Sequence, residues 1–130
     1  MIRYFDRKKI MMTRLFGAVF GGAQAGNVKM VSPADVRQWI DAGQAVVIDV
    51  REVNEHAAER IKGAINLPLS TFEVSQLPAI PEGAKLVFHC RSGQRCGMAA
   101  AKAVGAGYSG EINRMEGGIM AWRGMGYPVE

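Results

Sequence analysis

The sequence has few of the residues that build covalent or metal-based scaffolds. Its 130 residues include only two cysteines, Cys90 and Cys96, and two histidines. Two cysteines are too few for the disulfide framework of a small secreted domain, and their spacing without a histidine cluster does not fit a zinc site. We therefore expect no disulfide scaffold, no metal site and no cofactor.

Aromatic residues make up only 8% of the chain, and the excess of positive charge is confined to one end. Residues 1–14 carry five basic side chains and one acidic, which accounts for the whole net charge of +4. Residues 15–130 carry 11 basic and 11 acidic side chains. A neutral body without a basic stripe or an aromatic platform is not typical of nucleic-acid binding. We expect no nucleic-acid partner.

The chain also lacks a long apolar run. No stretch of about 20 apolar residues is present, so the sequence predicts no transmembrane segment. A basic stretch to Arg14, a short apolar run over 15–20 and Ala23-Gln24-Ala25 have a weak likeness to a secretory signal. Glycines interrupt that apolar run, so we interpret residues 1–27 as an N-terminal tail and 28–130 as the domain.

The location follows from the same residues. A reactive thiol must stay reduced, so the cytoplasm is the expected compartment. Export is the alternative, if residues 1–25 are a signal peptide.

The remaining residues alternate between strand and helix patterns, and the length suits one domain. Apolar segments without alternation, such as 45–50, are expected where both faces of a parallel sheet are covered. Ser32 and Pro33 are typical of a helix start. Strands are predicted over 28–31, 45–50, 63–68, 85–88 and 111–115, and helices over 33–42, 53–60, 95–106 and after Gly117-Gly118, with a helical turn or two in 70–77. This pattern predicts an α/β fold with a central, mainly parallel five-stranded sheet flanked by helices on both faces.

The clearest chemistry lies in the loop over residues 90–95. An apolar strand ends at Cys90, Arg91 and Arg95 follow in the loop, and an alanine-rich helix comes next. Backbone N–H groups and the helix dipole both favour negative charge at such a position. These surroundings lower a cysteine pKa from about 8.5 to roughly 3.5–7.5 and produce a nucleophilic thiolate. The loop predicts a reactive-cysteine enzyme with Cys90 as its catalytic residue.

Four pieces of the chain resemble, in order and spacing, the single-domain rhodanese family of sulfurtransferases. They are Ile48-Asp49-Val50-Arg51-Glu52, Ile61-Lys62-Gly63-Ala64-Ile65-Asn66-Leu67-Pro68, the Cys90 loop, and Glu116-Gly117-Gly118 with Ala121-Trp122 and Tyr127-Pro128-Val129. The resemblance covers about residues 28–129 and implies a rhodanese-like fold. It also implies that Cys90 takes the outer sulfur of thiosulfate, releases sulfite and carries a persulfide that a second thiol or cyanide removes.

The resemblance assigns expected roles around Cys90. Backbone N–H groups of the loop would surround the persulfide, and substrate binding would fall to Arg91, Ser92, Gly93, Gln94 and Arg95. Asp49 and Arg51 would support the loop and the neighbouring helix. Gly93 suits a left-handed backbone or a close approach. Cys96 has no ready role in the family: it is either a small buried helix residue or a resolving thiol that pairs with Cys90 or receives its sulfur.

Loop length separates sulfur transfer from related chemistry. Phosphatases and arsenate reductases of related fold have five residues between their cysteine and arginine, whereas four separate Cys90 from Arg95. The spacing therefore favours sulfur transfer. The resemblance implies thiosulfate or another sulfane-sulfur donor, with cyanide, a small thiol or a thioredoxin-like protein thiol as acceptor. The alternatives are a persulfide carrier or interaction module fed by a partner protein and, less favoured, a Cys-dependent phosphatase or arsenate reductase.

Overall fold

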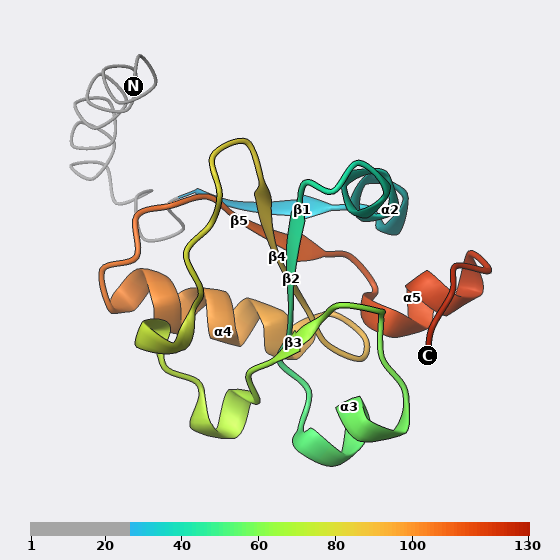
Figure 1. The fold of residues 1–130 in the computed structure, drawn as a ribbon. Coiled ribbons are helices and arrows are strands. Elements are labelled where there is room, and N and C mark those ends of the chain that lie inside the picture. Colours follow the sequence, from blue (N-terminus) through green and yellow to red (C-terminus); the bar gives the residue numbers. More distant parts are fainter. Residues whose placement is uncertain (1–26) are drawn as a thin grey trace.

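The computed structural model describes residues 27–130, and its elements follow the predicted alternation (Figure 1). The strands are β1 (Val28–Val31), β2 (Ala45–Asp49), β3 (Ile65–Asn66), β4 (Lys85–His89) and β5 (Ile112–Met115). The α-helices of this part of the chain are α2 (Pro33–Asp41), α3 (Val53–Ala58), α4 (Gln94–Gly105) and α5 (Gly118–Gly124). Two short 3₁₀ helices, η2 (Leu69–Thr71) and η3 (Val74–Gln76), precede β4. The predicted tail and its signal-peptide alternative lie outside the described residues, except for Asn27.

The five strands form one sheet in the order β1-β5-β4-β2-β3, and every strand pair is parallel. β4 lies in the middle, and its residue His89 is opposite Asp49 of β2. The carboxyl ends of parallel strands meet at one edge of a sheet, where ligands bind in folds of this type. Cys90 and Asp49 therefore lie at the same edge, and the predicted five-stranded α/β fold is confirmed.

Helices cover both faces of the sheet, and the sheet divides the hydrophobic core into two clusters. On one face, buried alanines of α4 pack with Phe72 and Phe88, whose rings meet edge to face at 5.8 Å between centroids. On the other face, Val36 of α2 packs in one cluster with Trp122 of α5. Figure 1 shows α4 on the opposite side of the sheet from α2 and α5. Full burial of each of these large side chains contributes about 1.5–3 kcal/mol.

Local signals set the start of α2. The Ser32 hydroxyl accepts a hydrogen bond from the Asp35 N–H at 3.0 Å, and the Asp35 carboxylate accepts one from the Ser32 N–H at 3.3 Å. This reciprocal capping satisfies two backbone donors that a helix start leaves free. The predicted start at Pro33 is confirmed.

Two predicted elements are shorter than expected. The helix predicted over 53–60 ends at Ala58, because Glu59 is extended (φ −166°, ψ 138°) and its carbonyl accepts a hydrogen bond from Arg51 at 2.6 Å. The strand predicted over 63–68 is limited to Ile65–Asn66. Beyond it, the N–H groups of Leu67 and Leu69 donate to the carbonyls of Asp49 and Val50, so the chain bends around the end of β2.

Among residues 27–130, none of the helices has the length and apolar composition needed to cross a lipid bilayer.

Candidate active site

Cys90 follows β4 directly, and its sulfur lies at the bottom of the loop. The side chain is 1% exposed, whereas Arg91, Ser92 and Gln94 are exposed at the rim. The sulfur accepts a hydrogen bond from the Gly93 N–H at 3.1 Å. The loop thus surrounds a buried sulfur with backbone donors and presents polar side chains to solvent.

The start of α5 fixes the orientation of the loop. The Ile119 N–H donates to the Cys90 carbonyl at 2.9 Å, and the Met120 N–H donates to the Arg91 carbonyl at 3.1 Å. In a planar trans peptide the C=O and the N–H point in opposite directions. Holding the Arg91 carbonyl against α5 therefore turns the Ser92 N–H inward, toward the sulfur.

Two glycines allow this arrangement. Gly93 has φ +118° and is the N-cap of α4, in the left-handed backbone that the sequence predicted. Gly118 has φ +62°, and a Cβ there would overlap the carbonyl oxygens of Cys90 and Arg91. Residue 118 must be glycine for α5 to approach the loop this closely.

The environment lowers the pKa of Cys90 to about 5. The largest cause is a hydrogen bond from the Cys96 thiol, which outweighs the opposing effect of burial. Backbone N–H groups of Cys96, Gly93 and Ser92 lower the pKa further. Cys90 is therefore a thiolate at neutral pH, which is the reactive form of cysteine. The sequence pointed to backbone N–H groups, the helix dipole and two arginines. The backbone donors do lower the pKa, but the strongest influence is Cys96, which the sequence did not indicate.

Cys96 lies in the first turn of α4 and is fully buried. Its sulfur lies 3.1 Å from the Gly93 carbonyl oxygen, so its single S–H proton has two acceptors, that carbonyl and the Cys90 thiolate. The neighbouring Cys90 raises the pKa of Cys96, so Cys96 stays protonated while Cys90 is a thiolate.

Arg114 of β5 was not among the residues singled out from the sequence. Its Nη2 donates to the Gly93 carbonyl at 3.0 Å, and Gly97 leaves room for it, since a Cβ at 97 would be 2.7 Å from that nitrogen. The signal in the sequence is an arginine inside the short strand Ile112–Met115, which is otherwise largely buried. A charged residue in an inner parallel strand is unusual and points to a specific partner.

Arg95 was predicted to bind substrate, but its guanidinium forms an ion pair with Glu55 of α3. Its two terminal nitrogens donate to the Glu55 carboxylate at 2.7 and 3.0 Å. These hydrogen bonds lower the pKa of Glu55 to about 2. Arg95 therefore fastens the start of α4 to α3, and Arg91 is the exposed arginine of the loop.

Asp49 and Arg51 form a buried ion pair beside the loop. Arg51 donates to the two carboxylate oxygens of Asp49 at 2.9 Å from Nε and 2.7 Å from Nη2. His56 Nδ1 of α3 lies 2.8 Å from the same carboxylate. Burial acts to raise the pKa of Asp49, but hydrogen bonds from Arg51 and His56 outweigh it and the pKa is lowered. The pair thus braces α3 directly.

His89 of β4 lies behind the loop next to this ion pair, and its Nε2 has no hydrogen-bond partner among the described residues. His89 Nε2 is 3.9 Å from Asp49 Oδ1, and its Nδ1 is 3.2 Å from the Cys90 carbonyl oxygen. Burial lowers the pKa of His89, which favours the neutral ring. A neutral His89 with its proton on Nδ1 donates to the Cys90 carbonyl and supports the loop from the sheet side.

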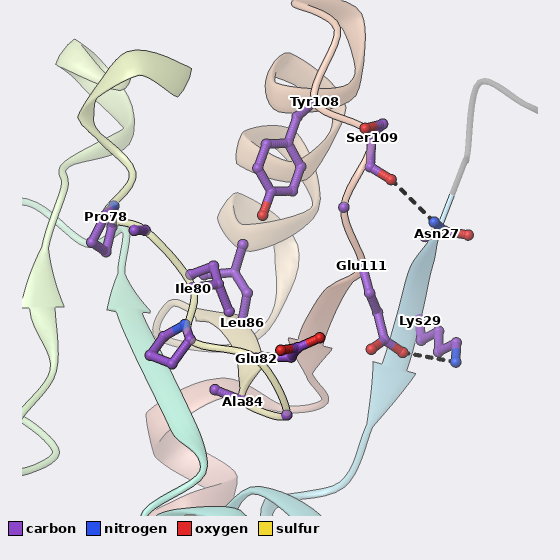
Figure 2. A pocket seen from close by; sticks show the side chains of 14 residues that line it. Asn27, Lys29, Pro78, Ile80, Glu82, Ala84, Leu86, Tyr108, Ser109 and Glu111 are labelled. Atoms are coloured by element: carbon purple, nitrogen blue, oxygen red, sulfur yellow. Dashed lines mark hydrogen bonds and ion pairs between the residues drawn. The ribbon is translucent and has the colours of Figure 1, made fainter. Parts of the chain in front are cut away.

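A metal site or a separate cavity could serve as the active site instead of the Cys90 loop. Within residues 27–130, no group of three or more His, Cys, Asp or Glu side chains is arranged to hold a metal ion. A cavity of about 700 Å³ lies at the opposite end of the sheet (Figure 2). Tyr108 lines it, and Glu111 at its edge pairs with Lys29 at 2.7 Å. No predicted site residue lines this cavity, so the candidate active site is the Cys90 loop.

Comparison with known proteins gives a consistent picture. The Rhodanese-like domain family matches residues 32–125. The chain is similar to the protein slr1261 of Synechocystis, with 38% identity over 99 residues that cover 76% of this chain and 54% of that protein. It is similar to a sulfurtransferase of Allochromatium vinosum, with 33% identity over 89 residues that cover 68% of this chain and 81% of that protein.

A solved structure is similar as well. The human single-domain sulfurtransferase TSTD1 has a TM-score of 0.60 and 30% identity, covering 73% of this chain and 95% of that chain. Several curated relatives are longer: this chain spans 54% of the Synechocystis protein and 44% and 38% of two others.

Proposed function

Because this chain belongs to the Rhodanese-like family, we propose that it moves the sulfane sulfur of thiosulfate to cyanide or a thiol through a persulfide on Cys90. The observation that carries the proposal is a buried Cys90 thiolate enclosed by backbone N–H donors, with the Gly93 N–H at 3.1 Å. The similarity to the Allochromatium vinosum sulfurtransferase supports the same reaction class.

In the first half-reaction, the Cys90 thiolate attacks the outer sulfur of thiosulfate. A bond forms between the two sulfurs, the S–S bond of thiosulfate breaks, and sulfite leaves with the electron pair. The product on the enzyme is an anionic persulfide, so the loop has the same charge before and after the step. Donors that stabilise the thiolate are already directed at the region where the new sulfur carries its charge.

The rim of the loop provides the means to attract the donor. Arg91 is exposed beside the buried sulfur, and a positive side chain there favours the approach of a dianion. Ser92 and Gln94 are exposed polar neighbours that can donate to sulfonate oxygens. Arg95 contributes as a positioning residue, because Glu55 already occupies its guanidinium.

In the second half-reaction, an acceptor attacks the outer sulfur of the persulfide and restores the Cys90 thiolate. Cyanide leaves as thiocyanate, and a thiol leaves as a new persulfide. Two separate half-reactions joined by a covalent intermediate give ping-pong kinetics. The open rim suits small thiols and also a protein thiol of the thioredoxin-like class.

The test uses reduced protein, anaerobically mixed with thiosulfate. Wild type is expected to release one sulfite per chain and to gain one sulfur, measured by intact mass soon after mixing. Cys90→Ser is the matched control and is expected to do neither. Absence of both sulfite and added sulfur in wild type would overturn the proposal.

Steady-state assays then separate turnover from carriage. Repeated sulfite release with cyanide, a dithiol or glutathione supports an enzyme. Negligible turnover together with rapid loading by a cysteine desulfurase would indicate a persulfide carrier instead. Cys90-dependent hydrolysis of an aryl phosphate would indicate phosphatase chemistry, which the four-residue spacing between Cys90 and Arg95 disfavours.

A further inference from the structure

The sulfurs of Cys90 and Cys96 both form hydrogen bonds with the backbone of one residue, Gly93. Its N–H donates to the Cys90 sulfur at 3.1 Å, and its carbonyl accepts from the Cys96 sulfur at 3.1 Å. Each cysteine is also the largest single influence on the pKa of the other. Gly93 therefore holds the Cys96 thiol on the same side of the loop as the Cys90 sulfur, which would become the inner sulfur of a persulfide.

A cationic side chain completes this pair. Arg114 donates to the Gly93 carbonyl at 3.0 Å, and it also forms a hydrogen bond with Cys96 that favours the thiolate. Its Nε is buried and has no hydrogen-bond partner among the described residues. Cys96 packs in the apolar cluster of α4. A guanidinium beside a buried thiol, however, is a feature of reactive cysteines and is not needed to fill space.

The charge on Cys90 determines whether Cys96 is held as a protonated, unreactive thiol. While Cys90 is a thiolate, its negative charge and hydrogen bond keep the proton on Cys96. In the persulfide, the negative charge moves to the outer sulfur and the inner sulfur becomes neutral. Loading of Cys90 thus removes the largest influence that holds Cys96 in its protonated form.

We propose that Cys96 is a resolving thiol that attacks the inner sulfur of the Cys90 persulfide and releases hydrosulfide. The proposal rests on the proposed function, because it needs the persulfide as its substrate. It adds a second activity, the release of sulfide without an external sulfur acceptor.

The step balances without another reactant. A bond forms between the sulfurs of Cys90 and Cys96, and the bond between the inner and outer sulfur breaks. The outer sulfur leaves with the electron pair and takes the proton of Cys96, giving hydrosulfide. The two cysteines are oxidised to a disulfide as the sulfane sulfur is reduced to sulfide. Recovery of the two thiols needs an external dithiol, which is itself oxidised to a disulfide.

The experiment follows the fate of the sulfur after loading. Reduced wild type is mixed with thiosulfate under anaerobic conditions without any thiol, quenched with acid at intervals and analysed by intact mass and sulfide assay. The added sulfur is expected to disappear, with one hydrosulfide released per chain and a final mass lower than the dithiol by two hydrogens. Peptide mapping is expected to find a Cys90–Cys96 disulfide. Wild type incubated without thiosulfate is the control and is expected to remain a dithiol.

Cys96→Ser provides the comparison, because its hydroxyl can still donate to the Cys90 sulfur. Whatever its loading rate, the sulfur that it takes up is expected to remain on Cys90, with no sulfide released. A wild-type persulfide that lasts as long as that of Cys96→Ser would overturn the inference. An added sulfur mapped to Cys96 would also overturn it, since it would mean transfer of the outer sulfur.

These outcomes are separate from failure of the proposed function. If wild type releases no sulfite and takes up no sulfur, the sulfurtransferase proposal fails at its first step. If it releases sulfite and keeps the sulfur, only the resolving role of Cys96 fails. Wild type alone decides both questions, so poor folding of Cys96→Ser does not affect the result.

Discussion

The N–H of Ile119 donates a hydrogen bond of 2.9 Å to the carbonyl of Cys90. This bond joins the first turn of α5 to the residue that carries the reactive sulfur. Together with the bond from Met120 to the next carbonyl, it sets the direction of the loop peptides. The inward N–H groups of the loop therefore depend on how closely α5 can approach.

Gly118→Ala is expected to disturb that approach. A Cβ at 118 would overlap the carbonyls of Cys90 and Arg91, and the φ of +62° is unfavourable for alanine. We expect a loss of about 1–3 kcal/mol in the free energy of unfolding, measured with urea, together with slower sulfite release.

Gly124→Ala is the matched control, because it lies in the same helix and the new methyl group would enter open space, with no neighbouring atom within 4 Å. Its free energy of unfolding is expected to stay the same or to rise by up to about 1 kcal/mol through helix propensity. Equal losses in the two variants would contradict the role given to Gly118.

The alkylation rate of Cys90 is expected to depend on pH with a midpoint near the pKa of about 5. Below this pH the thiol is protonated and reacts slowly; above it the thiolate reaches a plateau. Cys96→Ala removes the hydrogen bond that lowers the pKa most, so its midpoint is expected at higher pH. Iodoacetamide kinetics with peptide mapping measure both profiles. A midpoint that does not move in Cys96→Ala would show that the backbone donors are sufficient.

Asp49→Asn is expected to lower the free energy of unfolding by about 3–5 kcal/mol, because it leaves the buried Arg51 guanidinium without its partner charge. Asp49 is fully buried and bonded to Arg51 at 2.7 Å. Asp41→Asn is the control, since its pair with Arg37 at 3.1 Å is largely exposed and is worth at most about 1 kcal/mol. Urea unfolding at neutral pH measures both variants, and similar losses would argue against a special role for the buried pair.

The order of strands and helices was predictable because the signals that set it are local. Ser32 and Pro33 mark the start of α2, and the unbroken apolar run before Cys90 marks an inner strand. The left-handed backbone at Gly93 also follows from one residue type at one point of the loop. Element ends were less predictable where a distant group decides them, as Arg51 does at Glu59.

The partners around the sulfur could not be predicted in the same way. Glu55 and Arg95 are 40 residues apart in sequence, and Arg114 and Gly93 are 21 apart. Such pairs form only when the sheet brings their elements together. A single sequence does not show which residues become neighbours in space. The effect of Cys96 on the pKa of Cys90 was missed for a related reason. It depends on the turn at Gly93, whose backbone forms hydrogen bonds with both sulfurs.

The central place of β4 in the sheet has a consequence for hydrogen exchange. β4 pairs on both sides, with β2 and β5, whereas β1 and β3 each pair on one side. Amides of an inner strand exchange with solvent only when much of the domain opens, while edge strands exchange through smaller fluctuations. The reactive sulfur is thus anchored to the last part of the sheet to open, and its geometry persists through motions that already expose the edges.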